Sequence, residues 1–164
     1  MIMERKLLEI CNRQIEREAY SSNLYLAMAT WAETKGLEGI SQWLYAQSDE
    51  ERDHMMRFIK YVSERGEHAV IPALEKPPID YGSVKEMFDE VLKHEKFVTQ
   101  SINEIVAMAT ELNDYAMLNW IQWFIAEQFE EETSVQAVID KLELLGDKNL
   151  YLFDRDIMSM RGEH

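Results

Sequence analysis

The chain has 164 residues, of which 46% are hydrophobic and 29% charged, with six glycines and three prolines. This length fits one domain, predicted over residues 1–164, and the composition is that of a globular helical protein rather than a disordered one. The 31 acidic and 17 basic residues give a formal net charge of -14, which argues against a nucleic-acid partner.

Targeting and redox features are few. The one cysteine, Cys11, rules out an intramolecular disulfide framework. The first residues run directly into a charged helical segment without the apolar core of a signal peptide. No apolar run approaches the ~18 residues that a membrane-spanning helix needs. We therefore predict a cytoplasmic protein with no membrane partner.

Apolar residues recur at steps of three and four along most of the chain, which predicts long amphipathic helices. The first covers about residues 4–33, and a turn containing Gly36 and Gly39 ends it. The second covers about residues 40–65 and stops at Gly66. The short turn between them predicts an antiparallel pair.

The third helix begins after a glycine, with Ser83 as N-cap and Glu86 three residues on, the pattern of a capping box. A fourth helix is predicted over about residues 115–145. A short fifth helix is predicted over about residues 149–160, because three apolar side chains there share one stripe: Leu150, Phe153 and Ile157.

The link over residues 66–82 contains all three prolines and has no helical period. Its 17 residues could span about 55 Å when extended, whereas a 30-residue helix is about 45 Å long. The link can therefore run the length of a bundle. This predicts an all-α, four-helix bundle with one long crossover between helices two and three, plus the short fifth helix.

Each long helix has an inward row that is mostly apolar but is interrupted by a polar side chain near its midpoint. The midpoints of similar helices in a bundle lie at one level, so the side chains that interrupt the rows should converge. They form a hard, oxygen-rich donor set that suits two divalent ions bridged by shared carboxylates, and iron or manganese rather than zinc. The interrupting residues are Glu18, Glu51, His54, Glu95, Gln128 and Glu131.

Other interpretations apply to each residue alone. A single Glu or Gln on a helix row is usually a boundary residue that reaches water, and a lone His is usually a satisfied core histidine. Their common level favours the metal site. Tyr25 lies two turns after Glu18 and either donates a hydrogen bond to the site or is a buried core tyrosine. Gln14 and Gln47 are interpreted as polar positions at the bundle ends with no role.

The sequence resembles prokaryotic non-haem ferritins over essentially the whole chain. The matching stretches are residues 12–15 (NRQI), 20–26 (YSSNLYL), 50–54 (EERDH), 62–66 (VSERG), 94–95 (HE) and 123–131 (WFIAEQFEE).

The resemblance implies a ferroxidase centre with two irons per subunit. Glu18, Glu51 and His54 would hold one iron, and Glu51, Glu95 and Gln128 the other, with Glu51 bridging and Tyr25 nearby. It also implies a third iron site in which Glu131 reaches both sites. The acids of this third site would be Glu50, Glu127, Glu130 and Glu131. Taken singly, the first three could equally be solvated acidic side chains on helix surfaces.

Haem is not expected. Haem-binding bacterioferritins repeat the Glu-x-x-His motif on the fourth helix, where this chain has Gln128 and Glu131. The position of their haem-ligating methionine, two before the site histidine, is Arg52. Rubrerythrins are excluded because one cysteine cannot supply their Cys-x-x-Cys module.

The implied function is iron storage: oxidation of Fe(II) by dioxygen or peroxide, and retention of the Fe(III) mineral inside a homo-oligomeric shell of 24 subunits. Apolar residues beyond the inward rows suggest large subunit contacts, although some could only widen the core. The alternatives are another di-iron or di-manganese carboxylate oxidase and a metal-free helical-bundle interaction protein. The additional apolar residues are Leu24, Leu26, Trp31, Trp43, Trp120 and Trp123.

Overall fold

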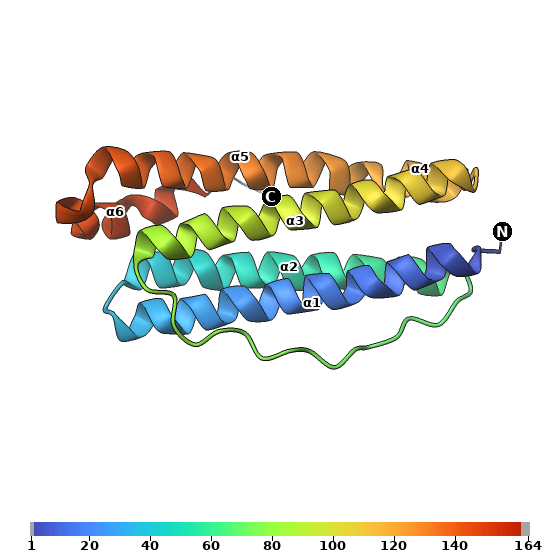
Figure 1. Cartoon of the computed structure of the whole chain (residues 1–164), viewed down its shortest axis with the longest axis horizontal. Helices are drawn as coiled ribbons and strands as arrows, with labels where there is room; N and C mark the ends of the chain where they lie inside the picture. The colour runs from blue at the N-terminus through green and yellow to red at the C-terminus, as the bar shows by residue number, and fades with distance from the viewer. Residues whose placement is uncertain (1, 162–164) are drawn as a thin grey trace.

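The computed structural model describes residues 2–161, and the part of the chain it describes contains helices and no strand (Figure 1). Two short 3-10 helices flank the last α-helix. None of the described helices is both long and apolar enough to cross a membrane. The elements are α1 (Arg5–Thr34), α2 (Glu38–Glu64), α3 (Val84–Glu111), α4 (Tyr115–Trp120), α5 (Gln122–Leu145), η1 (Asp147–Asn149), α6 (Leu150–Asp156) and η2 (Ile157–Met160).

The long helices form two antiparallel pairs. Figure 1 shows α1 beside α2, and α3 beside the α4–α5 segment, with the crossover running the length of the bundle so that α2 and α3 are parallel. The predicted four-helix bundle with one long crossover and a short C-terminal helix is confirmed.

Local sequence explains where the helices stop and start. Gly36 adopts a left-handed backbone (φ 75°) after α1, which lets the N–H of Leu37 bond back to the carbonyl of Ala32 at 3.0 Å. The hydroxyl of Ser83 accepts a hydrogen bond from the N–H of Glu86 at 3.1 Å, as the capping pattern predicted. These caps fix the register of the helices that carry the polar midpoints.

The predicted fourth helix is not continuous. It is interrupted at Ile121, where the chain makes a tighter i→i+3 bond from the N–H of Phe124 to the carbonyl of Ile121 (2.9 Å). The carbonyl of Leu118 accepts the side-chain amide of Gln122 at 3.0 Å. Side-chain competition for a backbone acceptor is not visible in apolar periodicity, so the sequence did not reveal this break.

The core is divided into two apolar clusters with the polar midpoints between them. One cluster, near the α1–α2 turn, includes Met28, Trp43 and Phe88. The other includes Leu7 and Ile102. Burying each of these apolar side chains stabilises the fold by roughly 1.5–3 kcal/mol. Because the clusters lie on either side of the polar layer, they also shield it from solvent.

The C-terminal segment packs on the first cluster. Phe153 and Ile157 are buried there, as their stripe predicted. The N–H of Ile40, at the start of α2, donates to a carboxylate oxygen of Asp154 at 2.8 Å. A Cβ on Gly39 would lie 1.8 Å from the Asp154 carbonyl oxygen, so glycine is required at this close contact. These contacts fix η2, and hence Arg161, over the side of α2.

Candidate metal centre

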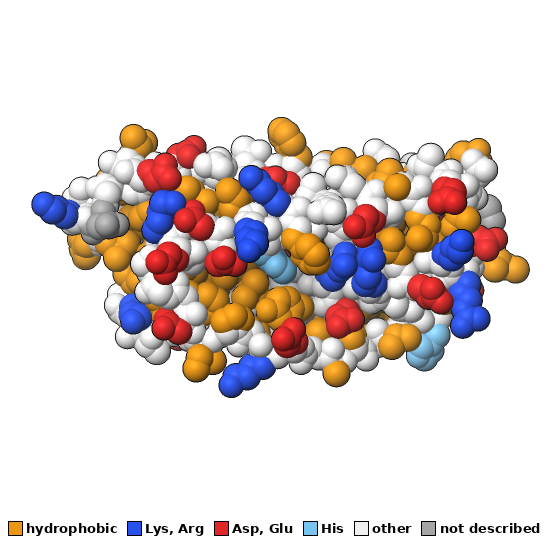
Figure 2. Space-filling model, viewed as in Figure 1, with side chains coloured by type: hydrophobic (Ala, Val, Ile, Leu, Met, Phe, Trp, Pro, Cys, Tyr) orange, Lys and Arg blue, Asp and Glu red, His pale blue; other side chains and the backbone are white. Residues whose placement is uncertain are grey.

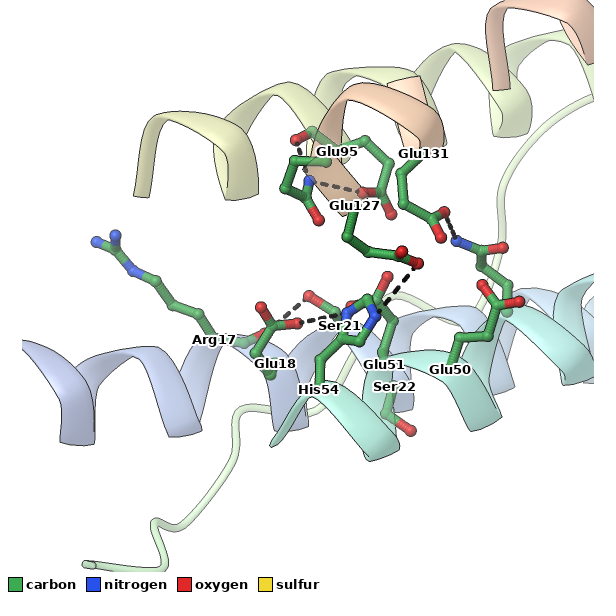
Figure 3. Close-up of polar contacts among 12 residues, drawn as sticks. Arg17, Glu18, Ser21, Ser22, Glu50, Glu51, His54, Glu95, Glu127 and Glu131 are labelled. Carbon is green, nitrogen blue, oxygen red and sulfur yellow. Dashed lines mark hydrogen bonds and ion pairs between the residues drawn. The ribbon is translucent and has the colours of Figure 1, made fainter. Parts of the chain in front are cut away.

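The side chains that interrupt the four inward rows meet in the middle of the bundle. Figure 3 shows carboxylates and an imidazole pointing toward one another from α1 and α2 on one side and from α3 and α5 on the other. Each is at most 2% exposed, so the layer is shielded from bulk solvent. The residues are Glu18, Glu51, His54, Glu95, Gln128 and Glu131.

The first group consists of Glu18, Glu51 and His54, whose candidate ligand atoms all lie within 4.8 Å of one another. The Nδ1 atom of His54 is 3.2 Å from Glu51 Oε2 and 3.7 Å from Glu18 Oε2. Its Nε2 atom is 3.7 Å from Oε1 of Glu127. A carboxylate from α1 therefore meets a carboxylate and an imidazole from α2, with the spacing of one cation's ligands.

The second group consists of Glu51, Glu95 and Glu131, again within 4.8 Å, so Glu51 belongs to both groups. The hydroxyl of Tyr25 donates to Glu95 Oε1 at 2.5 Å. The Nε2 of Gln128 donates to Glu95 Oε2 at 3.2 Å. Gln128 Oε1 is buried and has no hydrogen-bond partner among the described residues. The amide oxygen is thus available to a cation.

A third group of acids adjoins the second. It contains Glu50, Glu127 and Glu131, also within 4.8 Å, and Glu131 is shared with the second group. The structure does not bring Glu130 to it: this side chain is exposed and belongs to none of the three groups. Of the four acids that the resemblance implied for a third site, the structure therefore assembles three.

Burial and mutual repulsion govern the charges in this layer. Burial, and then the neighbouring Glu95, raise the pKa of Glu51 well above its usual value. Burial, with Glu95 and Glu50, raises the pKa of Glu131 to about 9. Burial disfavours the imidazolium of His54, but Glu51, Glu127 and Glu18 outweigh it and raise its pKa. Without metal, protons must neutralise the layer, which is the role that divalent cations would take over.

Several buried oxygen atoms in the layer have no hydrogen-bond partner among the described residues. Leaving such an atom unpaired costs about 1–3 kcal/mol, so a cluster of them indicates a missing positive group. With one imidazole among carboxylate and amide oxygens, the donor set fits Fe(II) or Mn(II). These atoms are Glu18 Oε2, Glu51 Oε1, Gln128 Oε1 and Glu131 Oε1.

Two glutamines that were interpreted from sequence as bundle-end positions with no role lie beside the ligands. Gln14 Nε2 donates to Glu18 Oε1 at 3.0 Å, and its Oε1 accepts from Ser101. Gln47 Nε2 donates to Glu131 Oε2 at 2.5 Å. That interpretation was wrong. Both lie on the inward rows, one turn before Glu18 and Glu51, and this position was the available signal.

His94, which was part of a matching stretch but was assigned no role from sequence, lies just outside the layer. The Nε2 of His94 is 2.6 Å from the hydroxyl oxygen of Ser21, and its ring meets that of Tyr25 edge to face. Burial lowers the pKa of His94 to about 4, so this ring is neutral at pH 7. It packs behind Tyr25 and helps to fix the tyrosine that bonds Glu95.

Cation binding should release protons, because Glu131 (pKa about 9) is protonated at pH 7 and a ligand carboxylate is not. We expect affinity to rise about tenfold per pH unit from pH 6 to 8 for one released proton. Anaerobic Fe(II) titration calorimetry in buffers of different ionisation enthalpy would measure this. Glu131→Gln should release one proton fewer, and a pH-independent affinity would contradict the assignment.

The raised pKa of Glu131 also makes the stability of the fold depend on pH. Above the usual Glu pKa of 4.5, Glu131 keeps its proton in the folded protein and loses it in the unfolded chain. The metal-free protein should therefore lose stability as the pH rises from about 4.5 to about 9.

Similarity to known proteins extends over most of the chain. A family model described as the ferritin-like domain matches residues 8–145. A probable bacterial non-heme ferritin-like protein from Haemophilus influenzae is 39% identical over 158 residues, covering 95% of this chain and 96% of that protein. The chain belongs to the ferritin family.

Other ferritins are also similar to this one over nearly their whole length. The bacterial non-heme ferritin of Campylobacter jejuni is 33% identical, over 97% of this chain and 96% of that protein. An open-pore ferritin from the archaeon Archaeoglobus fulgidus superposes with a TM-score of 0.93 at 40% identity, covering 98% of each chain. The resemblance to prokaryotic non-haem ferritins is confirmed.

Proposed function

We propose that this ferritin oxidises Fe(II) with dioxygen or peroxide inside each subunit and stores the Fe(III) product in a hollow shell. One observation carries the proposal: acids and an imidazole from four helices meet in a buried layer, where several oxygen atoms lack hydrogen-bond partners among the described residues. The relatives named bacterial non-heme ferritin support it. We further propose that it works in the cytoplasm.

The proposed roles follow the first two groups. Glu18, Glu51 and His54, the first group, would hold one Fe(II). Glu51 and Glu95 of the second group, together with the buried amide oxygen of Gln128, would hold the second. Glu51 is the carboxylate common to both sets. Two adjacent ions can each give one electron to dioxygen, which takes up two protons and leaves as hydrogen peroxide. Hard anionic ligands favour Fe(III) over Fe(II), which drives the oxidation.

The side chains around the irons divide the remaining work. The hydroxyl of Tyr25 donates a hydrogen bond to Glu95 and thereby orients that carboxylate. Gln128 offers a neutral amide oxygen, a weaker donor than a carboxylate, so the ferric product is held less tightly and can leave for the mineral. Glu50, Glu127 and Glu131 form the proposed third site. Glu130, being exposed, is not included.

We propose that the shell contains 24 subunits, as the resemblance implies. Figure 2 shows apolar side chains exposed between charged ones on the face formed by α1, α3 and the crossover. Of the residues suggested from sequence for subunit contacts, the subunit core buries Leu24, Trp31 and Trp43. Leu26 and Trp123 remain exposed at 43% and 38%. The crossover adds Ile71, at 69%.

The size of the particle tests the storage proposal. Twenty-four subunits of 19.3 kDa give about 463 kDa, which size-exclusion chromatography with light scattering would detect. After Fe(II) is added in air, iron should co-elute with this particle. A small di-metal oxidase would turn over without retaining mineral, and a metal-free interaction protein would do neither. A monomer or dimer that retains no iron would contradict the proposal.

A further inference from the structure

We propose that Arg161 is a built-in counter-cation for the third acidic group. It holds Glu50 while that group is without metal, and an entering Fe(II) ion must displace it. This inference rests on the proposed function, because it assumes that Glu50, Glu127 and Glu131 form an iron site. It assigns to the end of the chain a control over how readily that site fills.

Arg161 reaches the group from outside the four-helix bundle. Its Nη2 donates to Glu50 Oε1 at 2.6 Å, and its Nη1 donates to Gln47 Oε1 at 3.3 Å and to the Trp43 carbonyl at 3.1 Å. The guanidinium also lies 5.4 Å from the centroid of the Trp43 ring. Both ionic side chains are mostly shielded, at 14% exposure for Arg161 and 19% for Glu50. These contacts position the guanidinium at a site that is mostly shielded from solvent.

Hydrogen bonds connect Arg161 to two members of the acidic group, Glu50 and Glu131. Directly, Arg161 binds Glu50. Indirectly, it binds the Oε1 of Gln47, whose Nε2 donates to Glu131 Oε2 at 2.5 Å. The other oxygen of Glu131, Oε1, is buried without a hydrogen-bond partner among the described residues. The guanidinium therefore neutralises the outer member of the group, Glu50, while the buried Oε1 of Glu131 is available to an entering cation.

The positive charge of Arg161 opposes metal binding in two ways. A metal ion that uses the Glu50 carboxylate must compete with the guanidinium for it, and is also repelled by the guanidinium's charge across a poorly screened distance. Removing the arginine lifts both obstacles, so affinity at the third site should rise. The side chains that Arg161 bonds, Glu50 and Gln47, belong to neither of the first two groups. Arg161 reaches the second group only indirectly, through the bond from Gln47 to the shared Glu131, so the first two sites should change far less than the third. Because coupling is reciprocal, filling the third site should loosen the end of η2.

The experiment compares four versions of the assembled protein by anaerobic Fe(II) titration calorimetry. They are the unmodified protein, Arg161→Gln, Arg161→Lys and the control Arg155→Gln. Arg155 lies on α6, pairs with Asp156 and is 58% exposed. We expect the third Fe(II) to bind at least tenfold more tightly to Arg161→Gln, with the first two constants unchanged within twofold. Arg161→Lys keeps the charge and should stay within threefold of the unmodified protein, as should Arg155→Gln.

A second readout separates competition from a purely structural role. In the unmodified protein, hydrogen exchange over residues 157–161 should accelerate when the third Fe(II) is added, but not with the first two. An unchanged or weaker third constant in Arg161→Gln would overturn the inference, as would exchange that ignores the third equivalent. Failure of the first two Fe(II) ions to bind would instead overturn the proposed function.

Discussion

Replacing Glu51 with alanine is expected to slow rapid Fe(II) oxidation at least about a hundredfold, since loss of even an outer-shell partner of a metal costs about 10–100-fold. Glu51 is the carboxylate shared by the first two groups, so under the proposed assignment its removal takes a ligand from both irons at once. Stopped-flow absorbance after mixing Fe(II) with air-saturated buffer measures the early rate. His54→Ala should have a similar effect, because it removes the imidazole ligand from the first group.

The control for Glu51→Ala is Asp53→Asn, which neutralises an exposed acid two residues away on α2. It should oxidise Fe(II) at the unmodified rate. The Glu51 variant should still assemble, because its apolar clusters are intact and a buried carboxyl with a raised pKa has been removed from among other acids. An unchanged early rate in an assembled Glu51→Ala shell would refute the ferroxidase assignment.

Asp114→Ala should produce the largest loss of stability. The two carboxylate oxygens of Asp114 accept from Nη1 and Nη2 of Arg65, at 3.1 and 2.7 Å. One of them also caps α4 by accepting from the Met117 N–H at 2.9 Å. The side chains of the pair are 9% and 8% exposed. Removing one partner of a buried ion pair costs about 3–5 kcal/mol, because the other charge is left unpaired.

Thermal unfolding followed by circular dichroism measures this effect as a lower midpoint for Asp114→Ala. Asp89→Ala is the matched control: Asp89 pairs with Lys85 on the surface of α3, where the side chains are 52% and 42% exposed, and its loss should barely move the midpoint. Burial opposes ionisation of Asp114, but Arg65 outweighs it and lowers the pKa of this carboxyl. Its contribution should therefore persist at neutral pH and disappear in acid. Equal midpoints for the two variants would mean that the buried pair contributes no more than the surface pair.

Much of this fold was predictable because helical periodicity is a strong constraint. Residues at steps of three and four share a face, so each inward row could be listed before its partners were known. The proline-containing link was long enough to cross the bundle, and this length allowed α2 and α3 to be parallel. Ser83 and Glu86 marked the start of α3 correctly because a cap depends on residues within one turn.

The flanks of the helices were harder to interpret. Glu127, Glu130 and Glu131 follow one another closely on α5, and all three are acidic. The structure turns Glu127 and Glu131 toward the layer and leaves Glu130 exposed. The small rotation of α5 about its axis decides between them, and it depends on how the neighbouring helices pack. The same holds for Gln47 and Arg161, whose partners lie 84 and 111 residues away in the chain.

The sequence by itself determined that six polar side chains lie on the buried faces of four helices near a common level, because the 3.6-residue helical repeat fixes which residues share a face. Only the tertiary structure decided which acids beyond those six join the layer, and that an arginine from the end of the chain closes its outer side. Contacts between helices depend on their relative rotation and on distant segments, and a repeat within one helix does not specify either.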